Sequence, residues 1–155
     1  MRFRILGGTL LAVWAVAAVT AVSGQEPQAA AATPAAAPAS VLEGIYTEEQ
    51  AKRGEALYAQ ACANCHGATL QGGEMAPALA GADFIPAWVK QSVNDLFVRV
   101  HEDMPQDNPG TLTPEQAADT VAFMLAANKY PAGKTELSKD KDVLKTIKFD
   151  APPQP

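Results

Sequence analysis

The chain has 155 residues, with 12 Lys and Arg residues against 17 Asp and Glu residues and a formal net charge of −5 at pH 7. This acidic balance argues against nucleic-acid binding, because no basic surface is available for the phosphates. The length allows one domain. Its hydrophobic core would be small, which favours stabilisation by a covalently bound group or a metal.

The N-terminus has the features of an export signal. Residues 1–4 (MRFR) are basic, residues 5–22 are apolar and uncharged, and residues 21–23 (AVS) supply the small side chains of a cleavage site. We expect residues 1–24 to be a signal peptide, and the alternative is an uncleaved membrane anchor through residues 5–22, because the run is longer than a typical signal core. Either one would place the folded part in the periplasm.

Residues 25–43 are predicted to form a linker. The run from 27 to 40 (PQAAAATPAAAPAS) is almost entirely Ala and Pro. It lacks the large apolar side chains that offset the entropy of ordering, so we expect an exposed tether.

Three helices are predicted in the part that follows. In each, a Ser or Thr N-cap is followed three residues later by Gln or Asp, the pattern of a capping box. The helices are expected at about residues 47–61, 92–104 and 113–128.

Gly54 lies on the apolar stripe of the first of these helices. It either carries a mild helix penalty of about 1 kcal/mol, or marks a point where another helix passes so close that only hydrogen fits. Residues 67–86 are rich in Gly and Pro and show no strand alternation. An all-α domain with so long an irregular stretch is unusual, unless something other than protein fills its centre.

Residues 133–155 are predicted to be a C-terminal extension. The segment is mostly polar and rich in Lys and Asp, so a separate core is not expected from it. Four apolar residues would allow it to wrap back on the domain: Leu137, Leu144, Ile147 and Phe149.

The stretch CANCHG (residues 62–67) contains both cysteines and one of the two histidines. A structural zinc site needs four ligands, and His66 and His101 do not form a second close pair. A thioredoxin-like pair belongs at a helix N-terminus in a β–α–β pattern, whereas this motif ends a helix in a strand-poor chain. A plain disulfide is a third alternative. The contiguous C-x-x-C-H order, in which two thiols bind a haem and the next residue ligates its iron, favours haem c.

The chain resembles class I c-type cytochromes over about residues 44–132, and in particular the monohaem domains found with bacterial quinoprotein alcohol dehydrogenases. The matching features are Gly54, Tyr58, CANCHG, APALAG (76–81), MP (104–105) and PGTLTPEQAADTVAFML (109–125). The similarity to the monohaem domains found with quinoprotein alcohol dehydrogenases depends on the stretches LQGGEMAPAL, SVNDLF and YPAGKTEL. The resemblance implies a small all-α cytochrome c fold around one haem c, bound covalently by Cys62 and Cys65 with His66 as axial ligand. In this family the first and last helices cross at a glycine–aromatic contact, which would involve Gly54, Tyr58 and Phe123.

The second axial ligand is expected to be Met104, which matches the axial methionine of the family and lies at a helix exit before Pro105. Met75 falls in the loop that packs on the His66 side of the haem in the family. Met124 is expected in the core, and His101, beside two acidic residues, is expected to be solvated.

The resemblance also implies roles around the haem. The Pro77 carbonyl should accept a hydrogen bond from His66 and fix its orientation. Trp88 should reach a haem propionate through its indole N–H. Leu79, Phe97 and Leu112 should line the haem faces, although apolar residues are equally at home in an ordinary core.

The expected function is single-electron transfer rather than enzymatic catalysis, with a periplasmic dehydrogenase as donor and a terminal oxidase or another cytochrome as acceptor. One alternative is a cytochrome subunit bound permanently in a dehydrogenase complex. The others are a haem enzyme or gas sensor with open iron, and a thiol–disulfide protein without haem.

Overall fold

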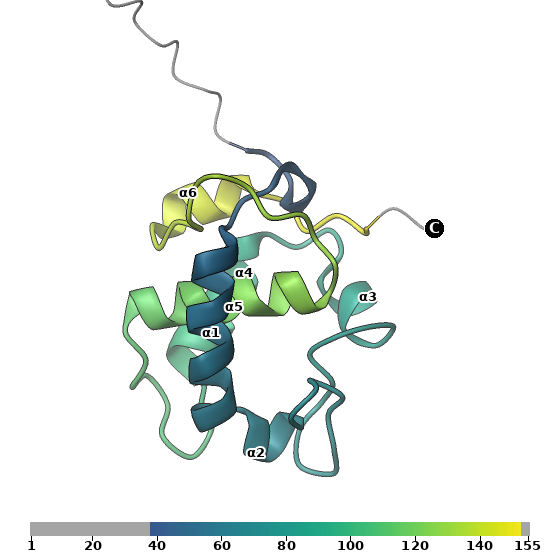
Figure 1. Ribbon diagram of the computed structural model, residues 1–155, viewed down its shortest axis with the longest axis vertical. Helices are drawn as coiled ribbons and strands as arrows, with labels where there is room; N and C mark the ends of the chain where they lie inside the picture. Colours follow the sequence, from purple (N-terminus) through teal and green to yellow (C-terminus); the bar gives the residue numbers. More distant parts are fainter. Residues whose placement is uncertain (1–37, 153–155) are drawn as a thin grey trace, which may run out of the picture. The chain divides into compact units, whose positions relative to one another are not determined.

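The computed structural model describes residues 38–152, in which helices are joined by irregular segments and no β-strand forms (Figure 1). The predicted all-α fold is confirmed. In chain order the helices are η1 (Val41–Glu43), α1 (Glu48–Ala61), α2 (Ala63–His66), α3 (Phe84–Trp88), α4 (Val93–Asp103), α5 (Pro114–Ala127) and α6 (Lys141–Thr146).

The N-terminal signal or anchor lies outside the described residues, as does most of the predicted linker. Within residues 38–152, no helix is both long enough and apolar enough to cross a membrane.

The capping residues set the helix starts as predicted. The Thr47 hydroxyl accepts from the Gln50 N–H at the start of α1, and Thr113 and Gln116 form a reciprocal capping box at the start of α5. Ser92 opens α4 in the same way. These are contacts between neighbours in sequence, which is why the sequence alone located them.

Helices α1 and α5 cross at Gly54. A β-carbon on Gly54 would lie 1.9 Å from the carbonyl oxygen of Asp119, and the rings of Tyr58 and Phe123 pack beside this point with centroids 5.3 Å apart. The second of the two interpretations of Gly54, a close helix crossing, is therefore confirmed.

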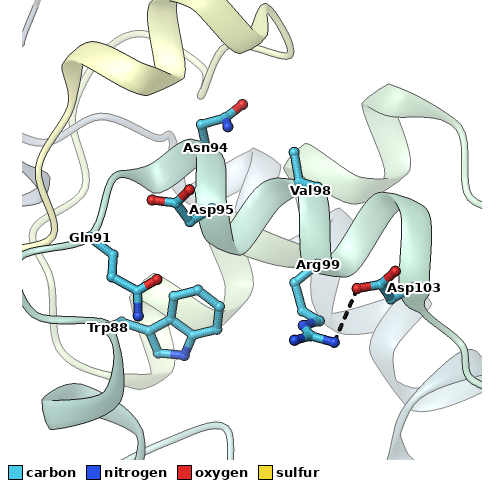
Figure 2. Close-up of a pocket in the computed structure, with 7 residues that line it drawn as sticks. All are labelled: Trp88, Gln91, Asn94, Asp95, Val98, Arg99 and Asp103. Carbon is cyan, nitrogen blue, oxygen red and sulfur yellow. Dashed lines mark ion pairs between the residues drawn. The ribbon is translucent and has the colours of Figure 1, made fainter.

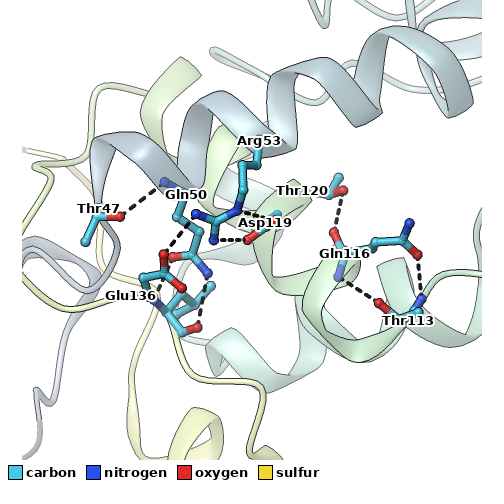
Figure 3. A network of polar contacts seen from close by, with 9 residues as sticks. Thr47, Gln50, Arg53, Thr113, Gln116, Asp119, Thr120 and Glu136 are labelled. Atoms are coloured by element: carbon cyan, nitrogen blue, oxygen red, sulfur yellow. Dashed lines mark hydrogen bonds and ion pairs between the residues drawn. The ribbon is translucent and has the colours of Figure 1, made fainter.

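An ion-pair group ties the same crossing to the C-terminal segment (Figure 3). Arg53 on α1 binds both carboxylate oxygens of Asp119 on α5 at 2.9 Å and reaches Glu136 at 2.9 Å. Hydrogen bonds to these two carboxylates raise the pKa of Arg53. Arg53 and Glu136 are about half exposed, and exposed ion pairs contribute little to the free energy of unfolding. The group therefore mainly fixes how α1, α5 and the C-terminal segment are oriented to one another.

The folded unit begins earlier than the predicted boundary at residue 44. Val41 is fully buried, its N–H donates to the Lys148 carbonyl at 3.0 Å, and the Lys148 N–H donates to the Ala39 carbonyl at 2.8 Å. The linker prediction is therefore wrong for the last residues of the predicted linker. Their hydrogen-bond partner, Lys148, lies about a hundred residues further along the chain, so local composition does not reveal the contact.

The C-terminal segment packs back on the domain. Its four apolar residues are at most 4% exposed, and residues 147–149 exchange backbone hydrogen bonds with residues 90–93 before α4. It also crosses the start of the domain closely, because a β-carbon on Gly133 would lie 1.8 Å from the Gly44 carbonyl oxygen. Helix α6 of this segment packs against α4 (Figure 1).

Gln50 is expected to be a measurable anchor of this segment. Its amide is 2% exposed, donates to the Leu137 carbonyl at 3.2 Å and accepts from the Leu137 N–H at 2.7 Å. Gln50→Ala should lower the free energy of unfolding by about 2 kcal/mol, because both Leu137 groups are left buried without a partner. Urea denaturation would measure this. Gln60→Ala, on the exposed side of α1, is the matched control and should change stability little.

Candidate cofactor site

The two cysteines lie one helical turn apart, where α1 gives way to α2. Cys62 is the C-cap residue of α1 and the N-cap residue of α2. The N–H groups of Cys65 and His66 donate to the Cys62 carbonyl at 3.1 and 3.0 Å. Both thiols are free, with Cys62 half-buried and Cys65 exposed. Residues three apart in a helix share a face, so both sulfurs can reach one group.

The chemistry of these residues disfavours the alternatives. Burial, with a smaller effect of Cys65, raises the pKa of the Cys62 thiol to about 11, whereas a thiol–disulfide enzyme needs a lowered thiol pKa. Among residues 38–152 there is no group of three or more Cys, His, Asp or Glu side chains placed to hold a metal, and structural zinc requires four ligands.

His66 is held in the orientation that an axial ligand needs. The ring is 8% exposed and its Nδ1 lies 2.8 Å from the Pro77 carbonyl oxygen, the contact expected from the sequence. A carbonyl oxygen only accepts, so Nδ1 must carry the proton and donate. The Nε2 lone pair is then left for a metal.

The loop after His66 is closed by two glycines with left-handed backbones. Gly67 has φ +80°, and Gly72, with φ +76°, donates its N–H to the His66 carbonyl at 2.8 Å. A β-carbon on Gly72 would lie 2.5 Å from the Ala78 nitrogen. The turn therefore brings Pro77 back against the histidine.

Asn128 fixes the far end of this loop. The sequence indicated only that a helix ends near Asn128 and did not indicate its role at this loop. Its side chain is buried at the end of α5, donates to the Leu79 carbonyl at 3.0 Å and accepts from the Gly81 N–H at 2.9 Å. A buried amide with partners on both sides holds the Pro77 loop against α5.

Tyr58 connects α1 to the same loop. Its hydroxyl donates to the Gly67 carbonyl at 2.6 Å, and burial, with a smaller effect of Cys62, raises the pKa of Tyr58 to about 12. Because this lies above the ordinary value of about 10, the stabilisation is complete below that value and is lost as the pH rises towards 12.

Tyr58→Phe should therefore lose less stability than the wild-type protein between about pH 9 and about pH 12. Denaturant unfolding curves of both proteins at these two pH values would measure the difference. An equal loss in both proteins would mean that Tyr58 does not carry the effect.

The four candidates for the second axial ligand differ in burial. Met75 is 80% exposed, and Met124 is 1% exposed in the core, as expected. Met104 is half-buried and caps α4, where the chain turns to extended backbone. His101 corrects the expectation of a solvated side chain, because its ring stacks on Phe97 at 5.6 Å and its Nδ1 is buried without a hydrogen-bond partner in the described part of the chain.

The predicted wall residues fall into two groups. Phe97 and Leu112 are buried in the core, whereas Leu79 and Trp88 are half-buried against it. Trp88 lines a pocket of about 300 Å³ together with Arg99, whose place beside Trp88 is not evident from the sequence (Figure 2). Arg99 pairs with Asp103 at 3.1 Å and is exposed. The indole N–H and the guanidinium are both donors, which is the chemistry that binds a carboxylate.

The residues present fit a covalently bound haem. Two thiols on one helical face, an adjacent imidazole with Nε2 unengaged, and half-buried apolar side chains supply what such a group requires. Two polar atoms of α4, His101 Nδ1 and Asn94 Oδ1, are buried without a hydrogen-bond partner among residues 38–152.

The chain is similar to a known protein family and to a solved structure. Residues 49–124 match the family described as "Cytochrome C oxidase, cbb3-type, subunit III". No curated protein matches the chain. The crystal structure of the sulfane dehydrogenase SoxCD from Paracoccus pantotrophus is similar at 20% identity with a TM-score of 0.45, over 70% of this chain and 62% of that chain. The chain therefore spans less than two thirds of the solved chain that it matches.

Proposed function

We propose that this chain, a class I c-type cytochrome with one haem c bound through Cys62 and Cys65, carries single electrons in the periplasm. Its electron donor would be a dehydrogenase, and its acceptor a protein such as a terminal oxidase. The observation that carries the proposal is the His66–Pro77 contact beside the paired thiols. It orients an imidazole for axial ligation and leaves Nε2 available to bind a metal.

The bound haem supplies an iron that changes between the ferric and ferrous states. Cys62 and Cys65 would bind the haem covalently, His66 would bind its iron, and we assign Met104 as the second iron ligand. A thioether opposite an imidazole favours the reduced state and raises the reduction potential, which suits an electron acceptor. With His66 and Met104 both bound to the iron, no position would be left for a substrate, so we propose a carrier and not an enzyme.

Export is the second part of the proposal and depends on the sequence. Residues 1–24 have the pattern of a signal peptide or anchor, and haem c is attached in the compartment that this pattern addresses. Removing them takes away Arg2 and Arg4 and leaves an acidic protein.

Two measurements on the protein matured in a bacterium able to attach haem c would test this function. A pyridine haemochrome spectrum should show one haem per chain that resists acid–acetone extraction, and a redox titration should show one reversible one-electron step. A colourless product would contradict the cofactor. A haem protein that binds carbon monoxide fully at the iron without denaturant would favour an open-iron enzyme or sensor instead.

A cytochrome subunit held permanently in a complex is the second candidate. It is favoured by the description of the matching family, which names a subunit of an oxidase. Purification from the native host under mild conditions separates the two. A stable stoichiometric partner would favour the subunit, and recovery of the cytochrome alone would favour a diffusing carrier.

A further inference from the structure

An exposed methionine stands beside the cysteine-bearing helix. Met75 is 80% exposed, whereas the next large apolar side chains, Val143 and Leu42, are 37% and 36% exposed. Its loop is closed by a hydrogen bond from the Gly73 N–H to the Ala76 carbonyl at 2.9 Å, and a β-carbon on Gly73 would lie 3.7 Å from the Cys65 carbonyl oxygen. The flexible, polarisable methionine side chain suits a contact surface that meets another protein.

Positive charge is absent from the two stretches that contain the proposed haem ligands. Residues 54–89 and 100–128 contain no Lys or Arg but hold eight Asp and Glu residues. Four of these eight are paired with cations from elsewhere in the chain. Glu74, next to Met75, and Asp107, three residues after Met104, are exposed and form none of the ion pairs of the described residues.

We call Cys65 with residues 73–77 and 104–108 the cysteine face. Its loops lie towards the end of α1 that carries α2 (Figure 1). Residues 39–41 and Lys148, which is hydrogen-bonded to them, lie at the other end of α1, a helix of 14 residues or about 21 Å. The cysteine face is therefore turned away from the point where the N-terminal segment joins.

We propose that the cysteine face docks a redox protein whose contact surface is basic, with Met75 at the apolar centre and Glu74 and Asp107 on the rim. This deepens the proposed function and depends on it, because one electron passes between the partners and no bond forms or breaks. Charge decides the occupant, since a second copy of this face or an anionic lipid surface would repel the same carboxylates.

Small redox reagents of opposite charge test the face on the holoprotein. Stopped-flow kinetics would follow oxidation of the reduced protein by cationic tris(phenanthroline)cobalt(III) and by anionic ferricyanide over a range of ionic strength. The test variant is Glu74→Gln/Asp107→Asn. The matched control is Glu48→Gln/Glu49→Gln at the start of α1, which removes the same two charges at the other end of the molecule.

At low salt, the rate of oxidation by the cationic reagent should be about three- to tenfold lower in the test variant than in the wild-type protein. This difference should disappear as added salt screens the charges. The control variant should change this rate less than about twofold, because its two charges lie about 21 Å away. Met75→Lys should also slow the cationic reagent and accelerate ferricyanide.

Two results would overturn the proposal. Equal effects in the test and control variants would mean that only net charge matters, and self-association of the holoprotein in sedimentation, abolished by Met75→Lys, would assign the face to a second copy. Both leave the carrier function intact. Failure of the protein to exchange an electron with either reagent would instead contradict the carrier function.

Discussion

Gly54→Ala is expected to lower the free energy of unfolding by about 3 kcal/mol. The added methyl group would lie 1.9 Å from the Asp119 carbonyl oxygen and 2.5 Å from its carbon, and these are backbone atoms of α5 that cannot rotate away. Helices α1 and α5 would have to separate, which disturbs the packing of Tyr58 on Phe123. Urea denaturation of the holoprotein would measure the loss.

Gly73→Ala is the matched control. Gly73 has no left-handed backbone, and its β-carbon would meet only the Cys65 carbonyl oxygen at an ordinary 3.7 Å. Stability should change by less than about 1 kcal/mol at this position. Equal losses in the two variants would mean that the helix crossing at Gly54 tolerates a side chain.

Met104→Ala is expected to remove the far-red sulfur–iron absorption band and to lower the midpoint potential by on the order of 0.1 V or more. The physical reason is the loss of the thioether that favours ferrous iron. Visible spectroscopy and a redox titration would measure both effects. Met75→Ala is the control, because this exposed side chain should leave band and potential unchanged.

A spectrum that is the same in the wild-type protein and in Met104→Ala would contradict methionine ligation. Loss of the band in Met75→Ala instead would move the ligand to the loop beside Cys65. The open-iron alternative predicts that the wild-type protein already lacks the band.

The sequence was most informative where the structure is local. Thr47, Ser92 and Thr113 cap helices through contacts three residues away, and C-x-x-C-H places its groups within one helical turn. Gly54 was also interpretable, because a glycine on the apolar stripe of a helix is explained either by a tolerated helix penalty or by a close crossing with another helix.

The features that the sequence did not show depend on distant partners. Asn128 gains its meaning from the loop at residues 79–81, and Val41 from Lys148. Helix α3 was expected to be irregular up to Pro86, yet proline is compatible with the first turn of so short a helix. Arg99 became part of the candidate site only when folding placed it in one pocket with Trp88.

The hydrogen bond from Ser40 to Asp150, at 2.6 Å and 110 positions apart, has a consequence for biogenesis. During vectorial synthesis the first end of the folded unit has to wait for the last, so closure of the domain is among the final events. Nascent Cys62 and Cys65 emerge some eighty positions before that closure. A chain that is exported from its N-terminus therefore exposes both thiols in the compartment of haem attachment before Asp150 arrives to close the folded unit.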